Sequence, residues 1–135
     1  MNRIVLFLCT GKSCRSQMAE AIVNARYSKE WRAFSAGTRP AGFVDPMAIQ
    51  VLHEIGIEHR GEPKSIEQFR HEDLDLVITV CDDANEECPV WLGQGKRVHE
   101  GFRDPAKAEG TDGERLAVFR QVRDEMLKKI PALLK

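Results

Sequence analysis

Short runs of consecutive apolar residues alternate along this chain with longer stretches in which apolar residues recur every three or four positions. Residues 3–9, RIVLFLC, form a continuous apolar run rich in branched side chains, which is typical of a strand buried on both faces. Residues 74–81, LDLVITVC, form a second such run, residues 31–37, WRAFSAG, alternate and end in glycine, and residues 96–100, KRVHE, give a weaker signal. The pattern therefore predicts four strands.

A first helix is predicted in the stretch that follows the opening strand and its turn. Met18, Ile22 and Ala25 recur there at helical spacing, so we expect them to share the buried face of the helix. Ser16 stands in a capping position, where a serine oxygen readily accepts a hydrogen bond from a free N–H of the first turn. This helix would connect the strands of residues 3–9 and 31–37.

Two further helices are predicted, one between strands and one near the end of the chain. Asp45 followed by Pro46 is typical of a helix start, and Gly56 is typical of a helix end. The apolar face of this helix comprises Met47, Val51, Leu52 and Ile55. A long amphipathic helix is predicted from Asp112 onward, and we expect it to stop before Pro131. Its apolar residues are Leu116, Phe119, Val122, Met126, Leu127 and Ile130.

Strands that alternate with helices imply parallel pairing through right-handed crossovers. We therefore expect an α/β fold with a central four-stranded parallel sheet in a single domain, residues 1–135. Open sheets of this kind place their sites beyond the carboxyl ends of the strands, and Cys9 and Cys81 both stand at such ends. The polar stretch of residues 104–114, DPAKAEGTDGE, is the best candidate for a mobile loop.

The composition is that of a folded, nearly neutral chain. With 42% apolar residues, 30% charged residues and a formal charge of −1, the sequence argues against disorder and against nucleic-acid binding. The apolar runs are too short to cross a bilayer and the N-terminus lacks the pattern of an export signal, so we expect a cytoplasmic protein without a membrane partner. Its 135 residues suit one domain, and we expect a monomer.

Four cysteines and four histidines are the residues most suited to metal or redox chemistry. In a reducing compartment, cysteines are expected to be buried, metal-bound or redox-active rather than permanently bridged. Cys81 and Cys88 lie too far apart in the sequence for the usual zinc knuckle. The histidines stand in different predicted elements, so we expect no metal site and place them at the surface or at helix ends. They are His53, His59, His71 and His99.

Five residues separate Cys9 from Arg15, which gives the pattern Cys-x5-Arg-Ser at the start of the first helix. The backbone N–H groups of this turn, the positive end of the helix dipole and the planar donors of Arg15 would form a cradle for a tetrahedral oxyanion. This cradle comprises Thr10, Gly11, Lys12, Ser13, Cys14 and Arg15. Such a field favours the thiolate of Cys9, whose pKa should fall well below about 8.5, and Ser16 could add a hydrogen bond to the sulfur.

A strand-to-helix turn with an ordinary buried cysteine is the alternative, and spacing alone does not decide between the two. A mononucleotide site is disfavoured, because Gly-x-Gly-x-x-Gly is absent and Gly11-Lys12-Ser13 lacks the first glycine of a nucleotide loop, since position 6 is leucine. Taken singly, Cys81 and Cys88 would more often be inert core or loop cysteines, and we expect Cys14 to be a packing residue.

Residues 8–22, LCTGKSCRSQMAEAI, resemble the active-site loop of the low-molecular-weight protein tyrosine phosphatase superfamily, and more closely that of its thioredoxin-coupled arsenate reductase branch. The similarity continues through SAGTRP, DPMAIQVLHEIGI, LVITVCDDANEECPV and GFRDPA, and so covers most of the chain. One departure is Lys12, where the family usually has asparagine. The resemblance implies a three-layer sandwich around the parallel sheet.

The resemblance also implies a thiol relay. Cys9 would attack arsenate and water would leave, Cys81 would then attack the Cys9 sulfur and release arsenite, and Cys88 would resolve the resulting disulfide. Reduced thioredoxin would then reduce the final Cys81–Cys88 disulfide and restore both thiols, with no bound cofactor. Asp104, followed by Pro105, matches the position of the superfamily's general acid. Phosphate or sulfate would compete with arsenate as oxyanions.

Two other functions stay open on the sequence. A tyrosine phosphatase would use the same loop, with the extra cysteines protecting the nucleophile from oxidation. In the phosphatases an aromatic residue commonly follows the Asp-Pro pair, whereas here Ala106 follows, and the chain has a single tyrosine. This favours a small inorganic substrate over a phosphoprotein. A non-catalytic redox-sensing or binding protein would leave the oxyanion cradle unexplained.

Overall fold

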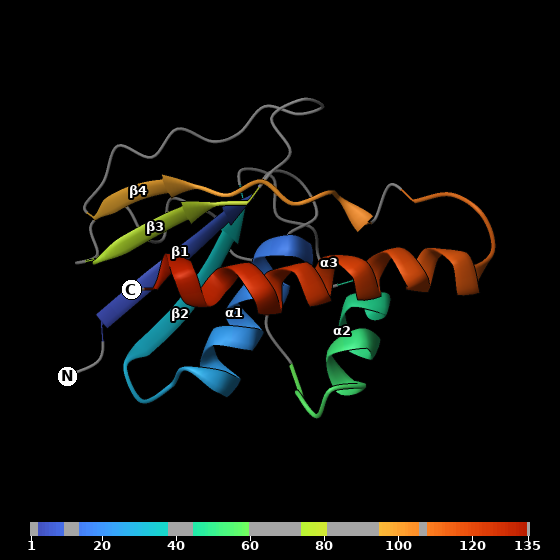
Figure 1. Ribbon diagram of the computed structural model, residues 1–135, viewed down its shortest axis with the longest axis horizontal. Coiled ribbons are helices and arrows are strands. Elements are labelled where there is room, and N and C mark those ends of the chain that lie inside the picture. Colours follow the sequence, from blue (N-terminus) through green and yellow to red (C-terminus); the bar gives the residue numbers. More distant parts are fainter. Residues whose placement is uncertain are drawn as a thin grey trace.

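The computed structural model describes residues 3–9, 14–37, 45–59, 74–80, 95–105 and 108–134 of the chain. Within these ranges, the four predicted strands and three predicted helices are present and follow one another in the predicted order (Figure 1). They are β1 (Arg3–Cys9), α1 (Cys14–Arg26), β2 (Trp31–Gly37), α2 (Pro46–His53), β3 (Leu76–Thr79), β4 (Lys96–His99) and α3 (Asp112–Leu133).

The four strands form one sheet in the order β2-β1-β3-β4, and every pair is parallel. The predicted α/β class and its four-stranded parallel sheet are therefore confirmed. The hydrogen-bond ladder continues past the strand ends, since Val80 N–H donates to the Leu8 carbonyl at 2.9 Å and Phe102 N–H donates to the Val80 carbonyl at 3.1 Å. Cys9 stands in register with Gly37 at the carboxyl edge of the sheet.

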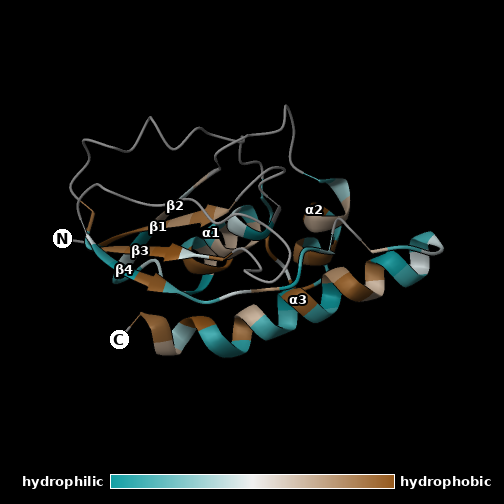
Figure 2. Cartoon of the chain, turned by 90° about the horizontal axis from the view of Figure 1, so that it is seen from above, coloured by the Kyte–Doolittle hydropathy of each residue, from teal (hydrophilic) through white to brown (hydrophobic). Residues whose placement is uncertain are grey.

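Both faces of β1 are buried, as in a sheet at the centre of a layered sandwich. Val5 and Phe7 belong to a core shared with α1, α2 and α3, whereas Leu6 and Leu8 belong to a second cluster, and all four are fully buried. Figure 1 shows α1 and α2 below the strands, with α3 running across them. In Figure 2, β1 is mostly apolar, while polar and apolar segments alternate along α3. None of the described helices is long and apolar enough to cross a bilayer.

Two expectations about α1 were wrong. The helix begins at Cys14, so Ser16 lies inside its first turn and not at its cap. Met18 and Ile22 are buried as predicted, but Ala25 is exposed. The last buried residue of the helix is Val23. Asn24, which is exposed, bonds to β2, since its side-chain amide donates to the Ala33 carbonyl at 3.1 Å and accepts from the Ala33 N–H at 2.9 Å.

The end of α3 also differs from expectation, because the helix passes through Pro131 and reaches Leu133. A proline lacks one helical hydrogen bond, but the last turn is held by the Leu134 N–H, which donates to the Ile130 carbonyl at 3.2 Å. Ile130 and Leu134 are both buried, so packing against the core offsets the lost bond.

Other boundaries follow from hydrogen bonds that the sequence pattern does not reveal. The third strand is shorter than residues 74–81, although Leu74 and Val80 on either side of it are buried. Residues 112–114 of the predicted loop belong to α3, which Thr111 and Glu114 start with a reciprocal capping box. The α2 segment closes as expected, with Gly56 at a φ of 80°.

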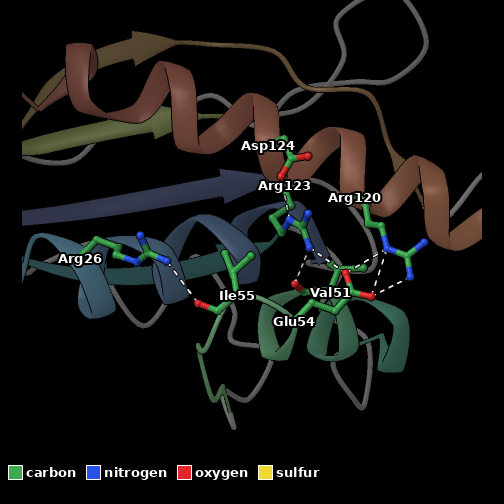
Figure 3. A network of polar contacts seen from close by, with 7 residues as sticks. All are labelled: Arg26, Val51, Glu54, Ile55, Arg120, Arg123 and Asp124. Atoms are coloured by element: carbon green, nitrogen blue, oxygen red, sulfur yellow. Dashed lines mark hydrogen bonds and ion pairs between the residues drawn. The ribbon is translucent and has the colours of Figure 1, made fainter.

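An ion-pair network joins α2 to α3 (Figure 3). Arg120 donates to both carboxylate oxygens of Glu54, with Nε at 2.9 Å from Oε1 and Nη2 at 2.7 Å from Oε2. Arg123, which is buried, donates through Nη1 to Glu54 Oε1 at 2.8 Å and to the Val51 carbonyl at 2.9 Å. The hydrogen bond from Arg120 is the main reason that the pKa of Glu54 falls from 4.5 to about 2, and Arg123 adds to it.

A Glu54→Gln variant should be less stable than the parent at pH 7 and lose that difference in acid. The native carboxylate binds its proton less tightly than the unfolded one, so the stabilisation is complete above about pH 4.5 and declines as the pH falls toward 2. We expect the melting temperature of the variant to lie a few degrees below that of the parent at pH 7. This difference in melting temperature should become smaller below pH 4.5. The control is Glu58→Gln, which changes an exposed glutamate. If the difference in melting temperature between Glu54→Gln and the parent did not depend on pH, the ionised Glu54 carboxylate would not be the source of the stabilisation.

Candidate active site

The predicted nucleophile and its serine partner meet at the junction between β1 and α1. Cys9 is the last residue of β1 and its side chain is fully buried. The Ser16 Oγ lies 3.1 Å from the Cys9 Sγ, so the two groups share a hydrogen bond, and Ser16 is fully buried as well. The contact forms because α1 starts at Cys14, which brings the first turn of the helix over the end of β1. The hydrogen bond expected between these two residues is thus present.

Arg15 lies on the same turn and is tied to the segment that follows β4. Its Nη1 donates to the Phe102 carbonyl at 3.2 Å, and its Nη2 lies 3.6 Å from the Asp104 Oδ2. The side chains of Arg15 and Asp104 are only 4% and 16% exposed. Phe102 is itself fixed to the sheet through Val80. The structure therefore brings Cys9, Arg15, Ser16 and Asp104 to one edge of the sheet.

This arrangement can bind and attack a tetrahedral oxyanion. A nearly buried guanidinium offers several N–H donors in one plane, and little water competes for them. The sulfur stands close to the N-terminus of α1, where the helix dipole favours negative charge. Asp104, held beside the guanidinium, is placed to exchange a proton with a group bound there. Nucleophilic attack by a thiolate with acid assistance is the chemistry that these groups support.

Several predicted site residues lie outside the described part of the chain. They are Thr10, Gly11, Lys12 and Ser13 of the loop, together with Cys81 and Cys88. Cys14 is the first residue of α1, but its side chain is not described. The last described residue before Cys81 is Val80, which is buried and hydrogen-bonded to the Leu8 carbonyl at 2.9 Å. Leu8 directly precedes Cys9.

His59 does not lie at the surface or at a helix end, so the sequence-based expectation for this histidine was wrong. Its side chain is 9% exposed, and its Nε2 lies 2.6 Å from Gln17 Oε1 and 3.8 Å from Glu20 Oε2. Burial lowers the pKa of His59 below its usual 6.5, and the Glu20 carboxylate does not reverse this direction. No motif marks His59 in the sequence. The contact of Phe102 with Arg15 was also not predicted, because it is made by the backbone carbonyl of Phe102 and does not depend on its side chain.

The chain matches a known protein family over almost its whole length. Residues 4–135 match the family described as low molecular weight phosphotyrosine protein phosphatase. An arsenate reductase of Halalkalibacterium halodurans is 47% identical over 130 residues, which are 96% of this chain and 93% of that protein. An arsenate reductase of Bacillus subtilis is 43% identical over 126 residues, with 93% of this chain and 90% of that protein covered.

Solved structures with the same fold include arsenate reductases and a protein tyrosine phosphatase. One described as an arsenate reductase in the phosphate binding state has a TM-score of 0.74 and 32% identity, and covers 97% of this chain and 95% of its own. The low-molecular-weight protein tyrosine phosphatase from T. tengcongensis has a TM-score of 0.75 and 25% identity, with 98% of both chains covered.

Proposed function

The chain belongs to the low-molecular-weight phosphotyrosine protein phosphatase family, and we propose that it reduces arsenate to arsenite with Cys9 as the nucleophile. The observation that carries this proposal is the Cys9–Ser16 hydrogen bond beside the buried Arg15, in a chain whose relatives of nearly equal length are arsenate reductases. Oxyanion binding at this edge is supported by the related reductase solved in a phosphate-binding state.

In the first step, the Cys9 thiolate attacks arsenic and forms a sulfur–arsenic bond. Arg15 and the N–H groups of the loop hold the arsenate oxygens, and their charge stabilises the oxyanion more strongly as it moves into the transition state. Ser16 donates its hydrogen bond to the sulfur and keeps it ionised. Asp104 gives a proton to the departing oxygen, which leaves as water. The product is a covalent Cys9–arsenic adduct in which arsenic is still in its +5 state.

In the second step, the Cys81 thiolate attacks the Cys9 sulfur. The sulfur–arsenic bond breaks with its electron pair on arsenic, so arsenite leaves and a Cys9–Cys81 disulfide forms. Cys88 then attacks Cys81, which frees Cys9, and thioredoxin supplies two electrons to reopen the Cys81–Cys88 disulfide. The hydrogen bond between Val80 and Leu8 supports this relay, because each residue directly precedes one of the two cysteines in the sequence. A cytoplasmic location, where thiols are kept reduced, is part of the proposal.

Hydrolysis of phosphate monoesters through a Cys9 phosphoenzyme is the second candidate function. The same nucleophile, arginine and acid would serve it, and the similar phosphatase from T. tengcongensis favours it as a side activity. The two functions diverge only after the first covalent adduct. Water completes a phosphatase cycle, whereas the neighbouring thiols complete a reductase cycle.

One comparison of activities tests the proposal. NADPH consumption with thioredoxin and thioredoxin reductase is measured with and without arsenate, and hydrolysis of an aryl phosphate is measured on the same preparation. Arsenate-dependent NADPH consumption that phosphate inhibits supports the reductase. Aryl phosphate hydrolysis without NADPH consumption indicates a phosphatase, and the absence of both activities indicates a redox-sensing or binding protein.

Ser16→Ala should weaken the nucleophile without removing it. A hydrogen bond to a charged group contributes about 1.5–3 kcal/mol, so we expect kcat/KM for arsenate near neutral pH to fall roughly tenfold or more. The acid limb of the kcat/KM–pH profile should move to higher pH, since that profile reports ionisation in the free enzyme. Ser28→Ala, in the exposed turn after α1, is the control. An unmoved acid limb would show that Ser16 does not stabilise the thiolate.

A further inference from the structure

Residues 55–59 lie along the length of α1 and are tied to both of its ends. At the C-terminal end, Arg26 Nη2 donates to the Ile55 carbonyl at 3.2 Å (Figure 3). Nine residues earlier on the helix, Gln17 contacts His59. The segment begins with a turn at Gly56, whose φ is 80°, and residues 57–59 follow this turn. One short segment thus contacts α1 near both of its ends.

The segment is also anchored between these contacts. Ile57 is buried, and its N–H donates to the Leu52 carbonyl at 3.0 Å, which fixes the segment to the end of α2. The α2–α3 network holds α2 in turn, through Glu54 and Arg123 (Figure 3). His59 thus reaches α1 from a segment whose position is set by the other two helices.

The His59 contact falls on the turn that carries the proposed active-site groups. Gln17 directly follows Ser16, and its side chain is fully buried, so its conformation depends on its hydrogen-bond partners. His59 Nε2 lies 2.6 Å from Gln17 Oε1, and we assign Nε2 as the donor, because an amide oxygen only accepts. Glu20, at 3.8 Å from Nε2, lies one turn beyond Ser16 on the same face of α1. The His59 N–H therefore orients the side-chain amide of Gln17, and it lies beside the largely buried carboxylate of Glu20.

We propose that His59 is a positioning residue for the oxyanion site, which holds the first two turns of α1 so that Arg15 and Ser16 are oriented before the oxyanion arrives. It does not touch the reacting atoms. The proposal rests on the proposed function only for the identity of the substrate, since binding of inorganic phosphate requires the same orientation and no reduction. A site prepared in this way binds more tightly because less ordering remains to be done on binding.

The test compares His59→Ala, His59→Gln and the control His53→Ala, which removes an exposed histidine at the end of α2. For each, the Kd for phosphate is measured by calorimetry, and KM and kcat for arsenate are measured with thioredoxin. We expect His59→Ala to raise the phosphate Kd and the arsenate KM together by about fivefold, as the loss of one neutral hydrogen bond allows, with kcat changed less than twofold. His59→Gln, which keeps a donor, should restore both constants to within about twofold.

Other outcomes separate the possible roles. If His59→Ala lowers only the melting temperature, or lowers kcat without changing either constant, the positioning role is wrong. If the phosphate Kd responds as expected but arsenate is not reduced by any variant, the proposed function fails and the role of His59 stands. Should His59→Ala not fold, the imidazole signals of the parent protein are followed by NMR during phosphate titration. The His59 signals should then shift more than those of His53, and an unchanged His59 signal would overturn the proposal.

Discussion

The Cys88→Ser variant will reduce arsenate for one turnover and then stop. Its Cys9 and Cys81 would still form a disulfide as arsenite leaves, but no thiol would remain to attack Cys81 and free Cys9. Mass spectrometry of the non-reduced, digested protein should find the Cys9–Cys81 bridge after one equivalent of arsenite has been released. Hydrolysis of an aryl phosphate, which needs only the first covalent step, should stay nearly intact.

Cys14→Ser is the matched control for this result, since Cys14 is expected to be a packing residue. That variant should turn over repeatedly and show no trapped bridge. Repeated turnover of Cys88→Ser with thioredoxin at the parent rate would mean that Cys88 takes no part in the relay. In that case Cys9–Cys81 itself would have to be the disulfide that the external thiol opens.

Arg15→Lys should lower kcat/KM for arsenate and for aryl phosphate alike, by roughly 10²–10³-fold. Losing one prepared donor to a developing oxyanion commonly costs about 2.7–4 kcal/mol, and a lysine ammonium cannot reproduce the planar fork of a guanidinium. Arg15 is also held by the Phe102 carbonyl and by Asp104, and the compact ammonium of a lysine lacks the separate donors that reach these two partners. Steady-state kinetics with both substrates measure the effect.

Arg120→Lys is the control for Arg15→Lys, because Arg120 pairs with Glu54 at the surface between α2 and α3. It should lower stability slightly and leave both activities unchanged. If Arg15→Lys kept the parent kcat/KM for arsenate while losing it for the aryl phosphate, the two reactions would not share one oxyanion site. The proposed first step would then be wrong for arsenate.

The sequence predicts the fold well where its signal is continuous. The continuous apolar run of residues 3–9 coincides with β1, because a strand covered on both faces needs an unbroken set of such residues, and the alternating residues 31–37 coincide with β2. It predicts less well where a boundary depends on packing between distant elements. Pro131 should end a helix by local rules, and it does not, because Ile130 and Leu134 hold the last turn against the core.

The sequence likewise predicts some residues of the candidate site and misses others. Cys9, Arg15 and Ser16 are recognisable from one short motif, since they must share a single turn, and Asp104 is recognisable from the family pattern around it. The structure brings all four together. His59 was misplaced because its contact with Gln17 bridges 42 positions and leaves no periodic or spaced signal in the chain. Cys81 and Cys88 lie outside the described residues, so their roles stay predictions.

The tie between Arg15 and the segment at Phe102 and Asp104 spans most of the chain and has a consequence for biosynthesis. A protein emerges from the ribosome N-terminus first, so Cys9 is made long before the residues that fix the guanidinium beside it. A nascent chain shorter than about 100 residues therefore carries the thiol without its finished oxyanion site. Reactivity toward arsenate would then arise only when synthesis is nearly complete, and a half-made polypeptide would be spared a premature covalent arsenic adduct.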